Sequence, residues 1–290
     1  MKKLLRGLAV IVVALLLVAV VALLFGRHRL YSRPDWYRAK HLTAAQSEAA
    51  ANSADQKMIA ARSQIAQAYA AQTRAARANS AAQTQPGSAF TLDLTEDETN
   101  AWIPKWEGEL GWKSKAAAYV KDPVIIFRKQ EIILAGEVKK WNSIVSLHFV
   151  PTLADGKLQI KLTQVTAGTL PLPRASWDGY LQKLTSALSA KLPELQRKAN
   201  IDQHGRANSA AVEAAMSELL LNTLNDQPAE AALFLPDQLG RSGSLPVKIT
   251  DVTVEDGTLS LSVEPMDAPQ RTALLNELKE PTSSATAASR

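Results

Sequence analysis

The sequence predicts an α+β domain: an antiparallel sheet with helices on one face, preceded by a single transmembrane helix and an alanine-rich helical stalk. Three observations lead to this prediction. An uncharged apolar run occupies residues 7–25, apolar and polar residues alternate between 144 and 163 and between 247 and 263, and two amphipathic patterns separate these strand regions. The absence of cysteine excludes disulfides, thiolate metal sites and a cysteine nucleophile.

The net charge of +5 is concentrated at the N-terminus. Residues 1–40 carry eight Lys or Arg and one Asp, a net charge of +7, which leaves the other 250 residues at −2. A nucleic-acid-binding domain needs a basic face, because neutralised phosphates supply most of its affinity. Nucleic acid is therefore not an expected partner.

A membrane anchor is predicted at Gly7–Phe25, a run of 19 uncharged residues. As a helix it covers about 28 Å, close to the hydrocarbon core of a bilayer. It is longer than an ordinary signal-peptide core and lacks an Ala-x-Ala cleavage site, so an uncleaved anchor is favoured over a removed signal peptide. Because moving Lys2, Lys3 and Arg6 across the membrane is unfavourable, we expect residues 1–28 to be a cytoplasmic tip and single-pass anchor in the cell membrane.

Residues 29–87 are expected to form a juxtamembrane segment and the helical stalk. Tyr31, Trp36 and Tyr37 are interleaved with arginines, a pattern typical of side chains at the level of the lipid headgroups. The alternative is a solvated, flexible hinge around Pro34.

An alanine-rich helix is predicted from Ala39 to about Gln83, since neither Gly nor Pro interrupts this stretch. Its larger apolar residues, Ile59, Ile65 and Tyr69, are too sparse for a leucine-type coiled coil. The segment is therefore either a stalk, with a surface for a protein partner, or a helix with one weak docking face.

The extracytoplasmic domain is expected at residues 88–267. Thr95 and Glu98 form a capping box that starts a helix reaching about Trp106. Strands follow at 124–127, 132–139, 144–150, 158–163, 247–254 and 259–263, with Asp-Gly hairpin turns at 155–156 and 256–257. Between them, amphipathic helices run from 177 to about 191, where Pro193 ends the first, and from about 209 to 224. Residues 268–290 are expected to be mostly disordered, with a short helix around 274–278.

Alternation along 144–150 assigns its two faces. Val145, Leu147 and Phe149 are expected in the core, whereas Ser146 and His148 fall on the polar face. A lone histidine on such a face is usually solvated.

No phosphate-binding, dinucleotide-binding, zinc-protease or hydrolase-elbow motif occurs, so no cofactor, metal or catalytic residue is predicted. A serine triad built from distant residues around His148 or His204 remains the enzymatic alternative.

Aromatic and apolar residues are the most conspicuous feature of the domain. They are expected either to fill the core or to line a cleft between sheet and helices that takes an acyl chain or similar amphiphile. The candidate ligand-binding residues are Trp102, Trp106, Trp112, Trp141, Leu170, Leu172 and Trp177.

The order of features resembles a known family. Leu94-Thr95 precedes Asn100-Ala101 at a helix start, Val150-Pro151 precedes Asp155-Gly156, and Gly168-x-Leu170-x-Leu172-Pro173 precedes an amphipathic helix. This pattern, over roughly residues 90–265, resembles the YpmS-like family of bacterial membrane-anchored extracytoplasmic proteins. The alanine-rich segment departs from it.

The resemblance implies an envelope location and transfers no catalytic residues. We therefore expect a non-enzymatic binding or scaffolding protein of the bacterial envelope whose ligand is a lipid or an envelope polymer. The alternatives are an envelope hydrolase and a purely structural stalked subunit.

Overall fold

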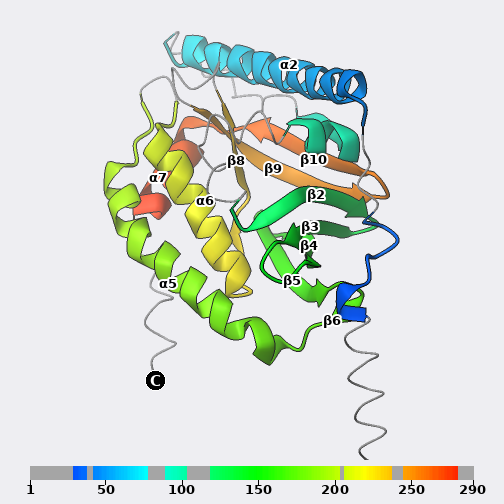
Figure 1. The fold of residues 1–290 in the computed structure, drawn as a ribbon. Coiled ribbons are helices and arrows are strands. Elements are labelled where there is room, and N and C mark those ends of the chain that lie inside the picture. The colour runs from blue at the N-terminus through cyan, green and yellow to red at the C-terminus, as the bar shows by residue number, and fades with distance from the viewer. Residues whose placement is uncertain are drawn as a thin grey trace, which may run out of the picture.

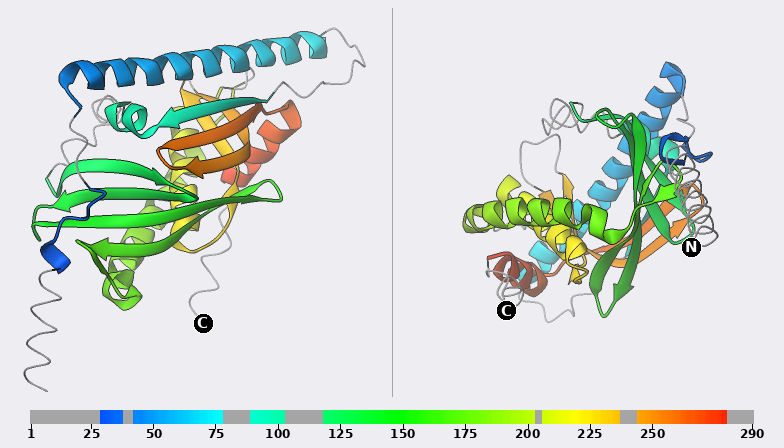
Figure 2. Two further views of the ribbon diagram at one scale, coloured as in Figure 1. Left: turned by 90° about the vertical axis from the view of Figure 1, so that its right-hand side faces the viewer. Right: turned by 60° about the horizontal axis from the view of Figure 1, so that its bottom comes forward.

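The computed structural model describes residues 29–37, 42–77, 89–102, 118–202, 206–236 and 244–279. These residues form two antiparallel sheets flanked by helices (Figures 1 and 2), which confirms the predicted α+β class. The predicted anchor, Gly7–Phe25, lies outside the described residues. In the described part of the chain, no helix is both long enough and apolar enough to cross a bilayer.

The smaller sheet has the strand order β1-β10-β9-β8. The central hairpin pairs Glu255 with Thr258 across Asp256-Gly257, as the Asp-Gly motif predicts. Its strands are β1 (Phe90–Thr95), β8 (Ala232–Pro236), β9 (Ser244–Glu255) and β10 (Thr258–Pro265).

The larger sheet has the order β2-β3-β4-β5-β6, and the short β7 also pairs with β5. Asp155 and Gly156 have φ angles of 52° and 74° in the β4–β5 turn, which confirms the second predicted hairpin. The strands are β2 (Val120–Arg128), β3 (Glu131–Val138), β4 (Ser143–Ala154), β5 (Lys157–Ala167), β6 (Leu170–Pro171) and β7 (Ala229–Glu230).

Three helices lie beside the sheets: α5 (Arg174–Lys198), α6 (Ser209–Leu224) and α7 (Ala268–Lys279). The prediction that Pro193 ends α5 is wrong, because the helix continues to Lys198. Leu192 and Leu195, on either side of the proline, are buried against α6, and this packing offsets the lost backbone hydrogen bond. The short helix expected around 274–278 is present within α7.

The alanine-rich segment forms α2 (Ala44–Arg77), which lies along the smaller sheet rather than standing clear of the domain (Figure 1). Ala61, Ile65 and Tyr69 are buried in the same apolar cluster as Val247 of β9. The Tyr69 hydroxyl donates to the carbonyl oxygen of Pro246 at 2.5 Å. The helix is confirmed, but it is not a free-standing stalk, because its buried face contacts the protein's own sheet.

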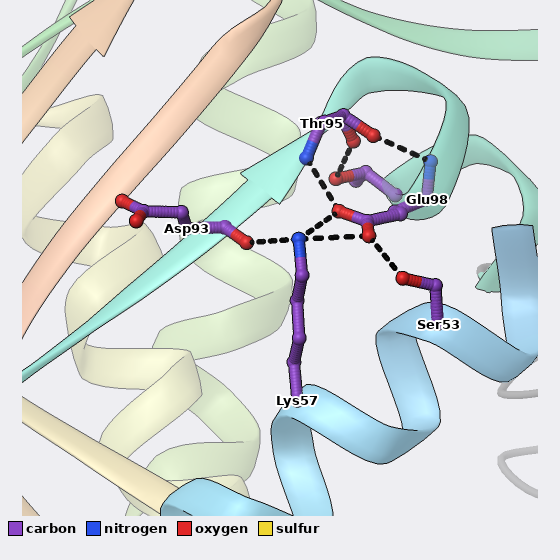
Figure 3. Close-up of polar contacts among 6 residues, drawn as sticks. Ser53, Lys57, Asp93, Thr95 and Glu98 are labelled. Atoms are coloured by element: carbon purple, nitrogen blue, oxygen red, sulfur yellow. Dashed lines mark hydrogen bonds and ion pairs between the residues drawn. The ribbon is translucent and has the colours of Figure 1, made fainter.

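A buried polar cluster attaches α2 to the end of β1 (Figure 3). The Thr95 N–H donates to Glu98 Oε2 at 2.8 Å and the Glu98 N–H donates to Thr95 Oγ1 at 3.2 Å, which confirms the capping box and starts a helix over residues 96–102. From α2, Ser53 Oγ donates to Glu98 at 2.6 Å, and Lys57 Nζ reaches both Glu98 and the Asp93 carbonyl at 2.8 Å. The capping carboxylate thus also fixes the position of α2.

Candidate functional site

On β4, the face that carries polar side chains is buried more fully than the face that was predicted to form the core. On β4, Ser146 and His148 have exposed fractions of 0% and 8%, whereas Val145, Leu147 and Phe149 are only half-buried. The alternation was predicted correctly, but the assignment of its buried face was wrong. What covers each face explains the reversal.

The juxtamembrane residues 29–37 cover the polar face. Tyr37 is buried in a cluster with Ile133 and Ile144, and Trp36 meets the His148 ring edge-on, with centroids 6.3 Å apart. The Tyr37 hydroxyl donates to the Asp122 carbonyl at 2.7 Å, and burial raises the pKa of Tyr37. The expectation that Trp36 and Tyr37 sit among lipid headgroups is therefore wrong, since both pack on the protein.

Residues 29–31 are held at the end of the same sheet. The Thr169 N–H donates to the Arg29 carbonyl at 3.0 Å, and Ser143 Oγ donates to the Leu30 carbonyl at 2.5 Å. Gly168, with φ +59°, lies so close that a Cβ there would be 2.3 Å from the Arg29 oxygen. The sheet thus holds the chain from Arg29 onward, four residues after the predicted span ends.

Beneath this segment, three side chains form a hydrogen-bonded series. Ser146 Oγ lies 2.9 Å from His148 Nε2, and His148 Nδ1 lies 3.0 Å from Glu131 Oε1. The order matches a serine–histidine–carboxylate triad. Ser146 is fully buried, however, and its hydroxyl also contacts Thr166 Oγ1 at 2.6 Å. In this arrangement a substrate does not reach the hydroxyl. His204, the other histidine considered for a triad, lies outside the described residues.

The opposite face of the larger sheet is apolar and partly uncovered. Leu134 of β3 is 41% exposed and pairs directly with Leu147. Further along β4, Leu153 lies on the same face and packs against the central cluster that contains Leu158. One end of this face is therefore core. The other end, formed by Leu134, Val145, Leu147 and Phe149 and hereafter the apolar face, is only partly covered, with Leu134 exposed and the other three half-buried.

Helix α6 packs at the core end of the larger sheet and carries further apolar side chains. Leu219 packs against the central cluster and Leu221 packs against α5. Successive helical residues are about 100° apart, so Leu220 is turned away from both of these packed neighbours. Leu220 and Met216, one turn away, are 47% and 40% exposed.

Helix α5 continues the same surface. Arg174 contacts Asp226 at 3.8 Å and Lys191 contacts Glu213 at 3.3 Å, so α5 runs antiparallel to α6. Only its C-terminal part, from Leu188 onward, is packed in the cluster between the two helices. In the other half, Tyr180 and Leu184 are 63% and 48% exposed, level with Leu220 and Met216.

Figure 2 (right) shows α5 on one side of the larger sheet and residues 29–37 on the other. Leu134, Val145, Leu147, Phe149, Met216 and Leu220 offer only hydrocarbon and thioether groups, which suits an acyl chain better than a charged ligand. In the described ranges, no group of three or more histidines or carboxylates is arranged to hold a metal ion.

The residues proposed from sequence lie on several elements. Trp102 Nε1 donates to Asp55 Oδ1 of α2 at 2.7 Å, and Trp141 is 44% exposed in the β3–β4 turn. Trp177 Nε1 donates to the Leu172 carbonyl at 3.3 Å. Leu172 follows β6, which contains Leu170, so Leu170, Leu172 and Trp177 lie in one region. Trp106 and Trp112 lie outside the described residues.

The residues that sequence reasoning missed are Leu134, Met216 and Leu220. Each belongs to a strand or helix pattern of apolar residues that is equally typical of a buried face. The signal that distinguishes them is their exposure, which depends on what the rest of the chain leaves uncovered.

Comparison with known proteins adds no assignment. No protein-family model matches the chain, and no curated protein matches its sequence. The likeness to the YpmS-like family therefore stays a prediction from the order of sequence features.

Proposed function

We propose that the protein is a single-pass, YpmS-like protein of the bacterial envelope that binds an amphiphile with its extracytoplasmic domain. Gly7–Phe25 would anchor it in the cell membrane with the N-terminus in the cytoplasm, and the apolar face would take an acyl chain. The role is binding rather than catalysis, and its ligand is a lipid or a lipid-linked envelope polymer.

One observation carries this proposal: β4 buries Ser146 and His148, whereas the apolar face on its other side is only partly covered. Leu134 of β3 and Met216 and Leu220 of α6 are each at least 40% exposed. Large apolar side chains left exposed on a folded domain are candidates for an interaction site. Because residues 29–31 hold the sheet close to the predicted anchor, membrane lipid is the apolar ligand nearest to it.

The test uses the full chain in liposomes that contain a phospholipid with a diazirine on its acyl chain. Light-induced crosslinks are mapped by peptide mass spectrometry. We expect crosslinks at Leu134, Met216 and Leu220, and an at least fivefold loss of them in a Leu134→Gln, Leu220→Gln variant. Ile59→Gln, which alters an even more exposed apolar residue on α2, is the matched control.

Two results would count against this function. Crosslinks confined to residues 7–25 would support the anchor and exclude acyl binding by the domain. A chain that fails to float with liposomes would exclude the anchor itself.

The Ser146–His148–Glu131 series favours a second candidate, a hydrolase whose site opens when residues 29–37 detach. A fluorophosphonate probe, which labels activated serines, tests it on the full chain in detergent. Labelling that Ser146→Ala abolishes and Ser176→Ala leaves intact would support this candidate. Ser146 is fully buried, so absence of labelling would mean that the three side chains form a structural hydrogen-bond network and not a catalytic site.

A further inference from the structure

Exposed aromatic side chains gather at one end of the larger sheet. Tyr119, Tyr31 and Trp141 are 72%, 51% and 44% exposed. Among the described residues, the remaining strongly exposed aromatic side chain is Tyr180 of α5. Large exposed rings are unusual on a soluble surface, so their common location needs a cause.

Backbone hydrogen bonds place these three residues together. The Lys139 N–H donates to the Tyr119 carbonyl at 2.9 Å, and the Trp141 N–H donates to the Val138 carbonyl at 3.0 Å within the same turn. Ser143, which follows the turn, donates to the carbonyl of Leu30, the residue before Tyr31. The start of β2, the β3–β4 turn and the juxtamembrane segment therefore form one end of the sheet, visible in Figure 2 (left).

Basic side chains surround these rings. Lys121, Lys139 and Lys140 are exposed beside Tyr119 and Trp141. Across residues 29–35, 119–122 and 137–142 there are five Lys or Arg and three Asp or Glu, a net charge of +2, whereas residues 41–290 together carry −2. Two of the acids are engaged locally, since Arg33 contacts Glu137 at 3.5 Å and Lys121 contacts Asp122 at 3.7 Å.

We propose that this end of the sheet, formed by Tyr31, Tyr119, Trp141 and the neighbouring lysines, is a docking surface for the headgroup region of an anionic bilayer. Tyr and Trp prefer the boundary between water and hydrocarbon, and lysines are attracted to anionic lipid. The surface lies next to the residues that follow the predicted anchor, which makes lipid its nearest partner.

This inference rests on the proposed anchoring and adds a second, independent contact with the membrane. It also gives the apolar face a route to its ligand. Val145 lies two residues beyond Ser143, so the apolar face begins at the docked end of the sheet and extends away from it. A lipid chain leaving the bilayer would meet Val145 and Leu147 first.

The cysteine-free chain allows a direct test with single-cysteine variants labelled with a fluorophore. Tyr119→Cys and Trp141→Cys report on the docking surface, and Ile59→Cys, on α2 over the other sheet, is the control. Full-length protein is placed in phosphatidylcholine–phosphatidylglycerol liposomes that carry a lipid spin-labelled near its headgroup. We expect at least twofold stronger quenching at 119 and 141 than at 59.

Charge dependence is tested in the same liposomes. Lys139→Gln with Lys140→Gln should lower quenching at position 141 at least twofold, and replacing phosphatidylglycerol by phosphatidylcholine should act in the same direction. Lys191→Gln with Lys198→Gln removes equal charge from two exposed side chains of α5 and should leave quenching unchanged.

Equal quenching at all three label positions, in protein that floats with the liposomes, would overturn the docking surface while leaving the anchor intact. Energy transfer between labels on different copies, without lipid quenching, would also overturn it by showing a protein interface. Protein that does not float with these anionic liposomes would contradict both the anchor and the docking surface.

Discussion

Gly168 leaves room for Arg29: a Cβ at position 168 would lie only 2.3 Å from the Arg29 carbonyl oxygen. The contact joins the β5–β6 turn to the first described residues of the chain. It therefore determines whether the juxtamembrane segment stays on the sheet or comes away from it.

Gly168→Ala should loosen that segment. Gly257→Ala is the matched control, because Gly257 also has a positive φ, +83°, but nothing within 4 Å of its Cβ position. Both variants should lose about 1 kcal/mol of stability through backbone strain. Gly168→Ala should lose about 1–3 kcal/mol more and show faster amide exchange over residues 29–37. Equal losses in the two variants would mean that this contact contributes little.

Ile65→Ala tests whether α2 is part of the folded core. Ile65 is fully buried, so its truncation should destabilise the domain by about 2–4 kcal/mol. Ile59 lies on the same helix and is 61% exposed, so Ile59→Ala should change stability by less than about 0.5 kcal/mol. Chemical denaturation of the full chain in detergent measures both. A small effect at Ile65 would show that α2 unfolds separately.

Glu98→Gln should weaken the cluster in Figure 3 in a pH-dependent way. Burial alone would raise the pKa of Glu98, but hydrogen bonds from Lys57, Ser53 and the Thr95 N–H outweigh it and lower that pKa. Because the folded pKa is lowered, the carboxylate stabilises the fold above its ordinary pKa, and this contribution is lost as the pH falls through the folded value.

We therefore expect Glu98→Gln to destabilise the protein by about 1–2 kcal/mol at pH 7 and by less below pH 4. Thermal unfolding at several pH values measures the difference. Glu48→Gln, at an exposed position of α2, should have no such pH dependence. A loss that is the same at all pH values would assign the effect to packing rather than to charge.

Local chemistry made several elements predictable from sequence. The Asp-Gly pairs at 155–156 and 256–257 set their hairpins, and Thr95 with Glu98 set a helix start. In each case the determining residues are neighbours in the chain, so the interaction is formed locally.

The burial of the sheet faces was not predictable in this way. Whether His148 or Leu147 faces solvent depends on Trp36 and Tyr37, more than 100 residues earlier in the chain. Tyr119 and Trp141 likewise become neighbours only when β2 pairs with β3. The candidate site consists of residues that the rest of the fold leaves uncovered. The alternation of residues within one strand does not indicate which side chains other segments will cover.

Glu218 of α6 supplies a prediction of the opposite sign to that of Glu98. Burial, and then the negative charges of Glu277 on α7 and Glu230 on β7, raise the pKa of Glu218 to about 7, while Lys157 on β5 opposes the shift. The folded state therefore binds more protons than the unfolded state between the ordinary carboxyl pKa and about pH 7. Stability should fall as the pH rises through this window and change little above it.

Glu218→Gln removes this penalty. Because Glu218 is partly exposed, solvent screening reduces the effect, and we expect the variant to be more stable than the parent by about 1–2 kcal/mol at pH 8 and nearly equal to it at pH 5. Denaturant midpoints at the two pH values measure this, with Glu213→Gln on the exposed side of α6 as the control. A Glu218→Gln variant that is less stable at pH 8 would mean that the ionised carboxylate is held favourably by Lys157 rather than repelled by its acidic neighbours.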